Sequence, residues 1–137
     1  MKYMLLIYHD ENLWSSYTEP EKQDIYQQYR SLVEELSASG KFIIGDELQP
    51  VTTANSVRVR DGKALIVDGP FAETREQLGG FFLVDAKDLD EAIAIAARLP
   101  GARAGTVEVR PVMQVSGLPE GSAARPVDLA GARSTQS

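Results

Sequence analysis

Two segments of this chain have apolar residues on one helical face only, and this pattern restricts its fold more than any other feature. The first segment begins with a capping box, Thr18-Glu19-Pro20-Glu21, and should end at Gly40. Its expected apolar stripe is Ile25, Tyr29, Leu32, Val33 and Leu36. The second segment follows Asp88, and its expected stripe is Leu89, Ala92, Ile93, Ala96 and Leu99, with Pro100-Gly101 as its end. A helix with a single apolar stripe packs against the rest of the protein through that stripe alone.

Short β-prone segments surround these two helices. The predicted strands are residues 3–8, 41–48, 55–60, 63–67, 81–84 and 106–110, and residues 10–17 are predicted to be a polar loop. Asp61-Gly62, between two alternating segments, favours a tight hairpin. The element order is therefore strand, helix, strand, hairpin, strand, helix, strand. This order is typical of a ferredoxin-like α+β fold with an added β-hairpin.

The segments 3–8 and 81–84 are apolar at both odd and even positions. Two helices can cover only one face of the sheet, so the other face needs a cover as well. A second copy of the chain is the simplest cover, and we predict a homodimer in which the two sheets face each other.

Composition excludes several classes of function. The 137 residues have a net charge of −6, which argues against a nucleic-acid partner. Cysteine is absent, so disulfides, zinc–thiolate sites and thiol nucleophiles are excluded. No stretch suits a membrane span, and the apolar opening segment is interpreted as a strand and not as a signal peptide, so we expect a cytoplasmic protein. Residues 1–115 are predicted to form one domain and residues 116–137, rich in Gly, Ala, Pro and Ser, a flexible tail.

Residues 68–84 read DGPFAETREQLGGFFLV and hold the main candidates for chemistry. Asp68 either accepts backbone N–H groups at the Asp-Gly-Pro turn or serves as a pocket carboxylate at the mouth of a barrel. Glu73 is the nearest further carboxylate, and its alternative role is a solvated acid paired with Arg75. Two carboxylates in one dry pocket would raise the pKa of one of them and form an acid/base pair.

Four further residues are assigned to substrate binding. Phe71 and Glu76 lie in the same segment as the two carboxylates. His9, the single histidine, follows the first strand and could titrate near neutrality, ligate a metal or simply lie on the surface. Arg110, near the end of the last strand, could hold an anionic ligand or form a salt bridge. Three aromatic residues are expected to make core or dimer contacts: Trp14, Tyr17 and Tyr26.

Four stretches resemble the DGPF proteins, a branch of the YCII-related family, over about residues 1–113. They are MKYMLLIYHDE, VRVRDGKALIVDGP, DGPFAETREQLGGFFLV and VEVRPVM. The resemblance implies a dimeric α+β barrel and a polar pocket with acidic residues, sometimes with a histidine. It also implies a gene setting near extracytoplasmic-function sigma factors. His9 stands where many relatives have glycine, so the resemblance assigns it no catalytic role.

The sequence thus favours a small-molecule enzyme without cofactor or metal, in which Asp68 acts as acid or base and Glu73 tunes it. It contains no phosphate loop, dinucleotide fingerprint, nucleophile elbow or zinc pattern. The alternative is a non-catalytic ligand-binding or regulatory module that acts with an extracytoplasmic-function sigma factor.

Overall fold

The structure of the protein is a computed structural model, and it describes residues 1–118. The predicted tail, residues 116–137, therefore lies almost entirely outside the described residues. No helix among residues 1–118 is long and apolar enough to cross a membrane.

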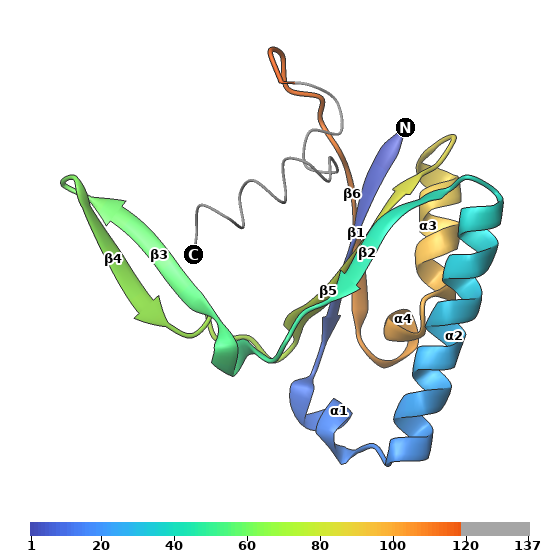
Figure 1. Ribbon diagram of the computed structural model, residues 1–137, viewed down its shortest axis with the longest axis horizontal. Coiled ribbons are helices and arrows are strands. Elements are labelled where there is room, and N and C mark those ends of the chain that lie inside the picture. Colours follow the sequence, from blue (N-terminus) through green and yellow to red (C-terminus); the bar gives the residue numbers. More distant parts are fainter. Residues whose placement is uncertain (119–137) are drawn as a thin grey trace, which may run out of the picture.

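A four-stranded antiparallel sheet with the order β2-β5-β1-β6 forms the centre of the fold. Its strands are β1 (Lys2–His9), β2 (Phe42–Glu47), β5 (Gln77–Asp85) and β6 (Thr106–Pro111). The helices are α1 (Glu11–Ser16), α2 (Glu19–Ala38), α3 (Leu89–Arg98) and α4 (Pro100–Ala104). All four helices lie on one side of the sheet (Figure 1). This arrangement confirms the predicted ferredoxin-like α+β fold.

Residues 49–76 form an excursion between β2 and β5, which are themselves neighbours in the sheet. The excursion contains a single-turn helix, Val51–Thr53, and a hairpin made of β3 (Asn55–Arg60) and β4 (Lys63–Asp68). The two hairpin strands form a separate sheet that projects on the side away from the helices (Figure 1). The backbone N–H of Leu48 donates to the carbonyl of Gly79 at 2.8 Å and closes the excursion at its root. The predicted added hairpin is thus confirmed.

The core lies between the sheet and the two long helices. Alternate residues of β1 face the helices, and Tyr3, Leu5 and Ile7 are buried there. The other buried apolar residues are Leu32, Leu36, Phe82, Val84, Ala86, Ala92, Ile95, Ala96 and Leu99. The stripe predicted for α2 is therefore confirmed in its C-terminal half, where Leu32 and Leu36 are buried and Val33 packs against them.

The apolar stripe predicted for α3 is confirmed at Ala92, Ala96 and Leu99 but was wrong at Leu89 and Ile93. Ile95 is buried, whereas Ile93 is 48% exposed and Leu89 is 46% exposed. Residues 92, 95, 96 and 99 satisfy the helical spacing as well as residues 89, 92, 93 and 96 do, so spacing alone cannot choose between these two faces. The neighbouring strands decide which face is buried.

Three further boundaries differ from the sequence prediction. Residues 11–16, expected in a loop, form α1, whose first turn is capped by the Asp10 side chain accepting from Asn12 N at 2.9 Å. A helix of six residues is too short to show a period. Strand β5 begins at Gln77 and not at Phe81, so Gly79 and Gly80 lie inside the strand. Pro100 begins α4 directly after α3 ends, since proline is well suited to the first turn of a helix.

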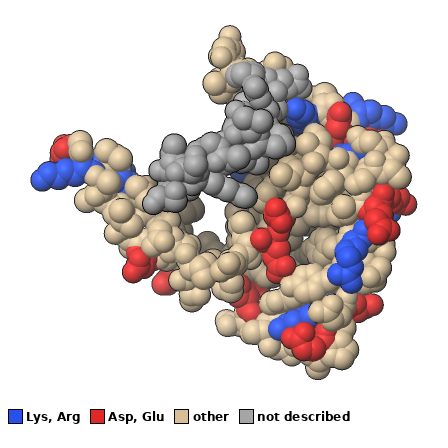
Figure 2. Space-filling view, in the orientation of Figure 1, with Lys and Arg blue, Asp and Glu red and all other residues tan. Residues whose placement is uncertain are grey.

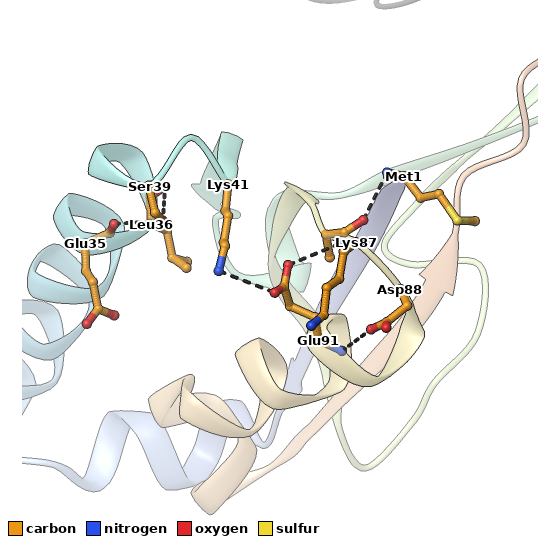
Figure 3. A network of polar contacts seen from close by, with 9 residues as sticks. Met1, Glu35, Leu36, Ser39, Lys41, Lys87, Asp88 and Glu91 are labelled. Carbon is orange, nitrogen blue, oxygen red and sulfur yellow. Dashed lines mark hydrogen bonds and ion pairs between the residues drawn. The ribbon is translucent and has the colours of Figure 1, made fainter.

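A polar network ties the chain start to the beginnings of β2 and α3 (Figure 3). The Glu91 carboxylate accepts from Lys41 Nζ at 3.4 Å and from the backbone N–H of Lys87 at 3.1 Å. The backbone N–H of Glu91 donates to the Asp88 carboxylate at 2.9 Å, which caps α3 as the sequence predicted. The amino group of Met1 donates to the Ala86 carbonyl at 3.0 Å. These contacts fix the end of the sheet opposite the candidate site.

Candidate active site

A cavity of about 1020 Å³ lies between the helix-covered face of the sheet and helices α1, α2 and α4. It occupies the end of the sheet where β1 runs into α1. Apolar and aromatic side chains make up most of its wall, as in most small-molecule sites. The aromatic residues of this wall are Trp14, Tyr17, Tyr26, Tyr29, Phe42 and Phe82.

Three of these aromatic rings form a cluster around Trp14. The ring of Tyr17 lies 5.8 Å from that of Trp14, and the ring of Tyr26 lies 5.5 Å from it, both edge to face. The Nζ of Lys22 lies 5.6 Å from the Trp14 ring centre. The three aromatic residues were expected in the core or at a dimer contact, but they are only half-buried and line the cavity. The cavity therefore offers flat π surfaces to a ligand.

His9 stands at the end of β1 and lines the cavity. Its imidazole has no hydrogen bond or ion pair with any other residue between 1 and 118, and its ring centre lies 6.4 Å from that of Trp14. Gly79 lies directly against it, because a β carbon at position 79 would come within 2.4 Å of the His9 Nε2 atom. The absence of a side chain at Gly79 thus makes room for the imidazole.

Two tyrosine hydroxyls are among the polar groups of the wall, which also includes four carboxylate side chains: Asp10, Glu34, Asp46 and Glu47. The Tyr26 hydroxyl donates to the Glu47 carboxylate at 3.2 Å, and the Tyr29 hydroxyl accepts from the backbone N–H of Gly101 at 3.0 Å. Burial raises the pKa of both phenols, and the charge of Glu47 adds to the rise for Tyr26. Both phenols therefore keep their protons at neutral pH and can act as hydrogen-bond donors.

Two arginines bring positive charge to the same cavity. Arg30 comes from α2 and Arg103 from α4, and both side chains are exposed. Each donates to a glutamine of α2, Arg30 to Gln27 and Arg103 to Gln28. Guanidinium groups in this position can attract an anionic ligand.

His9 is the one residue among the six predicted site residues that lines this cavity. Asp68 ends β4 outside the cavity lining, is exposed, and accepts from the side-chain amide of Asn55 at 2.8 Å. Phe71 follows it and is 84% exposed. Glu73 is also exposed and outside the lining. Their roles in binding or catalysis stay predictions.

The last two predicted residues have protein partners. Glu76 accepts from the Thr106 hydroxyl at 2.8 Å, a contact that joins the start of β5 to β6. Arg110 lies on the helix-free face of β6 and pairs with Glu108 on the same strand, which raises the pKa of its guanidinium. The salt bridge considered for Arg110 is thus present, and its ligand-binding role stays a prediction.

Sequence reasoning missed most of the cavity wall. Tyr29, Phe42, Phe82 and Gly101 come from four different elements and meet only in the folded chain. One usable signal was the adjacent pair Gly79-Gly80 within an apolar run, since glycine inside a strand often marks a close approach by another group.

Metal binding was also considered at the sequence level. Between residues 1 and 118 there is no group of three or more histidine, aspartate or glutamate side chains arranged to hold a metal ion. The expectation of a metal-free site is not tested by this finding.

The fold and the cavity together define a class: small ferredoxin-like α+β proteins with a cavity between the sheet and the helices. The sequence comparison then gives the family. The model of the YCII-related domain matches residues 1–116, and the chain belongs to the YCII-related family.

Two individual proteins are similar to this chain, one in sequence and one in fold. An uncharacterized protein of Rhizobium meliloti (strain 1021) is 37% identical over 114 residues, which cover 82% of this chain and 92% of that protein. The solved structure of 5-chloro-2-hydroxyhydroquinone dehydrochlorinase from Burkholderia phenoliruptrix AC1100, in complex with 2,5-dihydroxybenzoquinone, matches with a TM-score of 0.50. The match has 14% sequence identity and covers 87% of this chain and 100% of that chain. At this identity, the likeness establishes the fold.

Proposed function

We propose that this protein is a cytoplasmic enzyme that acts on a small hydroxylated aromatic or quinone-like molecule by acid/base chemistry, without an organic cofactor. The observation that carries this proposal is the position of His9, an imidazole without a protein partner among the described residues, at a cavity walled by aromatic rings. A histidine side chain can both accept and release a proton near neutral pH.

In the proposed reaction step, His9 takes the proton of a ring hydroxyl of the substrate. The electron pair of the broken O–H bond stays on the substrate oxygen, which becomes an oxyanion. The neutral Tyr29 hydroxyl, which accepts from Gly101 N–H and still has its own proton to give, then donates a hydrogen bond to the developing negative charge. Arg30 and Arg103 stabilise the same charge at longer range. The substrate ring packs against Trp14, and this contact fixes its plane.

The structural neighbour supports the choice of substrate class. That protein is a 5-chloro-2-hydroxyhydroquinone dehydrochlorinase, and its structure is a complex with 2,5-dihydroxybenzoquinone. An aromatic ligand also suits the cavity of the present chain, because much of its wall is aromatic.

Asp68 and Glu73 keep their place in the proposal as further acid/base groups. Neither lines the cavity of its own chain, so they would act on a substrate held elsewhere, including a site completed by a second copy. We also propose that the protein is a homodimer whose helix-free sheet faces meet. The apolar residues Met4, Leu6, Phe81 and Leu83 alternate with the core residues on β1 and β5 and therefore lie on that face.

The experiment uses 2,5-dihydroxybenzoquinone as the probe and 5-chloro-2-hydroxyhydroquinone as a candidate substrate. After His9 takes the hydroxyl proton, the oxyanion's electron pair moves into the ring and the chlorine leaves as chloride with its bonding pair, so the step needs no oxidant. Because the chain has one histidine, the imidazole resonances in an NMR spectrum belong to His9 without further assignment. The probe should shift these resonances in the wild type, and Trp14→Leu should weaken its binding at least about tenfold, since a stacked aromatic contact is lost.

His9→Asn tests the catalytic step. It should lower turnover of the hydroxyhydroquinone by about 10²–10⁴-fold while leaving probe binding within about threefold, as expected for the loss of a general base. The matched control is Ser37→Ala on the exposed side of α2, which should alter neither value. Equal turnover by wild type and His9→Asn would overturn the proposed role of His9. Probe binding without any turnover would favour the ligand-binding or regulatory alternative, in which a sigma factor is the partner.

A further inference from the structure

The β3–β4 hairpin has one entirely apolar surface patch, and it faces solvent. In the antiparallel register Val57 is opposite Ile66, and Val59 is opposite Ala64, so these four side chains share one side of the hairpin. Val57 is 62% exposed, Val59 61% and Ile66 67%. We call these four residues the apolar hairpin face.

The opposite side of the hairpin is basic at its tip. Arg58 is opposite Leu65 and Arg60 is opposite Lys63, and all three charged side chains are exposed. The alternation predicted for residues 55–60 therefore places both arginines on one side of the hairpin. That side also carries two exposed apolar residues, Leu65 at 48% and Val67 at 62% exposure.

Contacts within the chain hold the hairpin only at its root. Asn55 donates to Asp68, the Ser56 hydroxyl donates to the Gly69 carbonyl at 2.8 Å, and Gly69 N–H donates to the Ala54 carbonyl at 2.7 Å. Between residues 1 and 118, no hydrogen bond or ion pair joins residues 57–67 to the four-stranded sheet. An isolated two-stranded hairpin is at best marginally stable in water. The apolar hairpin face therefore needs a partner surface.

We propose that this partner surface is a second copy of the chain, which each hairpin clasps through its apolar face. This inference rests on the homodimer proposed above and identifies the element that holds it together. The hairpin projects from the side of the sheet that no described helix covers (Figure 1). One two-fold interface can thus bury the apolar hairpin face and the apolar helix-free sheet face of both copies at once.

Charge also favours a second copy. The chain has a net charge of −6, whereas residues 58–63 hold three bases and one acid, Asp61. Figure 2 shows the basic side chains gathered at the hairpin tip and several acidic groups over the body of the protein. A basic tip that reaches across to an acidic body finds complementary charge on any second copy. The apolar hairpin face, on the other side of the same hairpin, does not suit a nucleic acid.

The first measurement identifies the surface that contacts the apolar hairpin face. Because the chain has no cysteine, Ile66→Cys introduces a single thiol, to which a benzophenone maleimide can be attached. Irradiation of the full chain should give a product with twice the mass of one chain, in which residue 66 is joined to the partner. The matched control is Ile93→Cys, 48% exposed on α3 on the helix side, which should give no such product. A cross-link from residue 66 to residues 119–137 of the same chain, or no cross-link at all, would overturn the proposal.

The second measurement tests whether the face contributes binding energy. The double variant Val57→Lys/Ile66→Lys changes two side chains that are exposed within one chain, so it should keep its circular dichroism spectrum. Sedimentation equilibrium should give a dimer mass for the wild type and a dissociation constant at least about tenfold higher for the variant. A monomeric wild type would overturn the dimer and the clasp together. A dimeric wild type with an unchanged variant would overturn the clasp alone, and binding of the quinone probe reports on the cavity independently of both results.

Discussion

Gly79 and His9 lie so close that a single added carbon would disturb the imidazole: a β carbon at position 79 would be 2.4 Å from Nε2 and 2.6 Å from Cδ2 of His9. The atoms in the way belong to the end of a rotatable side chain and not to the backbone. Gly79→Ala should therefore rotate His9 out of place at a cost in unfolding free energy of less than about 1.5 kcal/mol. Probe binding and turnover should fall much more than stability does.

A double-mutant cycle checks this relationship. In the His9→Ala background the added methyl group has space, so Gly79→Ala should then cost less unfolding free energy than in the wild type. The measurement is urea denaturation of all four proteins. Equal costs in both backgrounds would mean that Gly79 is constrained by something other than His9.

The capping box at the start of α2 is a second target. The Thr18 hydroxyl accepts from Glu21 N at 3.3 Å, and the Glu21 carboxylate accepts from Thr18 N at 2.9 Å, which lowers the pKa of Glu21. Thr18→Ala should lower the unfolding free energy by about 1 kcal/mol, the usual loss for a capping residue. Thermal denaturation measures this loss. Ser37→Ala in the same helix leaves the cap intact and should change the unfolding free energy little in the same experiment. A Thr18→Ala protein as stable as the wild type would mean that α2 does not depend on this cap.

Tyr29 should make stability fall in alkaline solution. Burial raises its pKa in the folded protein above the value of about 10 found in unfolded chains. Between the two pKa values the folded chain keeps a proton that the unfolded chain releases, so its contribution to stability is complete below about pH 10 and is lost as the pH rises through the folded pKa. Tyr29→Phe should flatten this alkaline decline in urea midpoints.

At neutral pH the same variant should lose about 0.5–1.5 kcal/mol, because the Gly101 N–H no longer has the phenol oxygen as acceptor. In an alkaline absorbance titration of the wild type, Tyr26 and Tyr29 should ionise late, because both have raised pKa values. In Tyr29→Phe only the late component of Tyr26 should remain. An alkaline decline of the same steepness in both proteins would contradict the prediction.

Variants at Asp68 and Asn55 can separate the structural role of Asp68 in the hairpin from its proposed catalytic role. Asp68→Asn removes the charge, and Asn55→Ala removes the amide that donates to it at 2.8 Å but leaves the carboxylate in place. Both changes should increase amide hydrogen exchange in β3 and β4 to a similar degree, with global stability changed by about 1 kcal/mol or less. Turnover that falls in Asp68→Asn and stays normal in Asn55→Ala would support the catalytic role predicted from the sequence.

Features that depend on neighbouring residues were predictable from the sequence. The boundaries of β3 were predicted to the residue, because Asp61 and Gly62 both adopt positive φ angles, 52° and 74°, in the tight turn that this dipeptide favours. The caps at Thr18 and Asp88 were predicted for the same reason, since each acts on the next three residues. The overall order of strands and helices followed from these local signals.

Features that depend on distant contacts were not predictable. The buried face of α3 contains Ile95 in place of Ile93 because the strands beneath it fix its rotation. The cavity brings His9, Tyr29 and Gly101 together from three parts of the chain, and no spacing rule relates them. The acidic residues of the 68–84 segment were prominent in the sequence, yet the structure brings none of them into the cavity lining.

The hydrogen bond from Leu48 to Gly79 has a consequence for how such proteins diversify. It brings the two ends of residues 49–76 to adjacent points on the neighbouring strands β2 and β5. The excursion is therefore an insertion into a sheet whose strands already pair with each other without it. A lengthened, shortened or exchanged hairpin would leave the hydrophobic core and the His9 cavity as they are. The dimer contact proposed for the hairpin lies on this excursion and the cavity does not, so relatives that share the cavity need not share that contact.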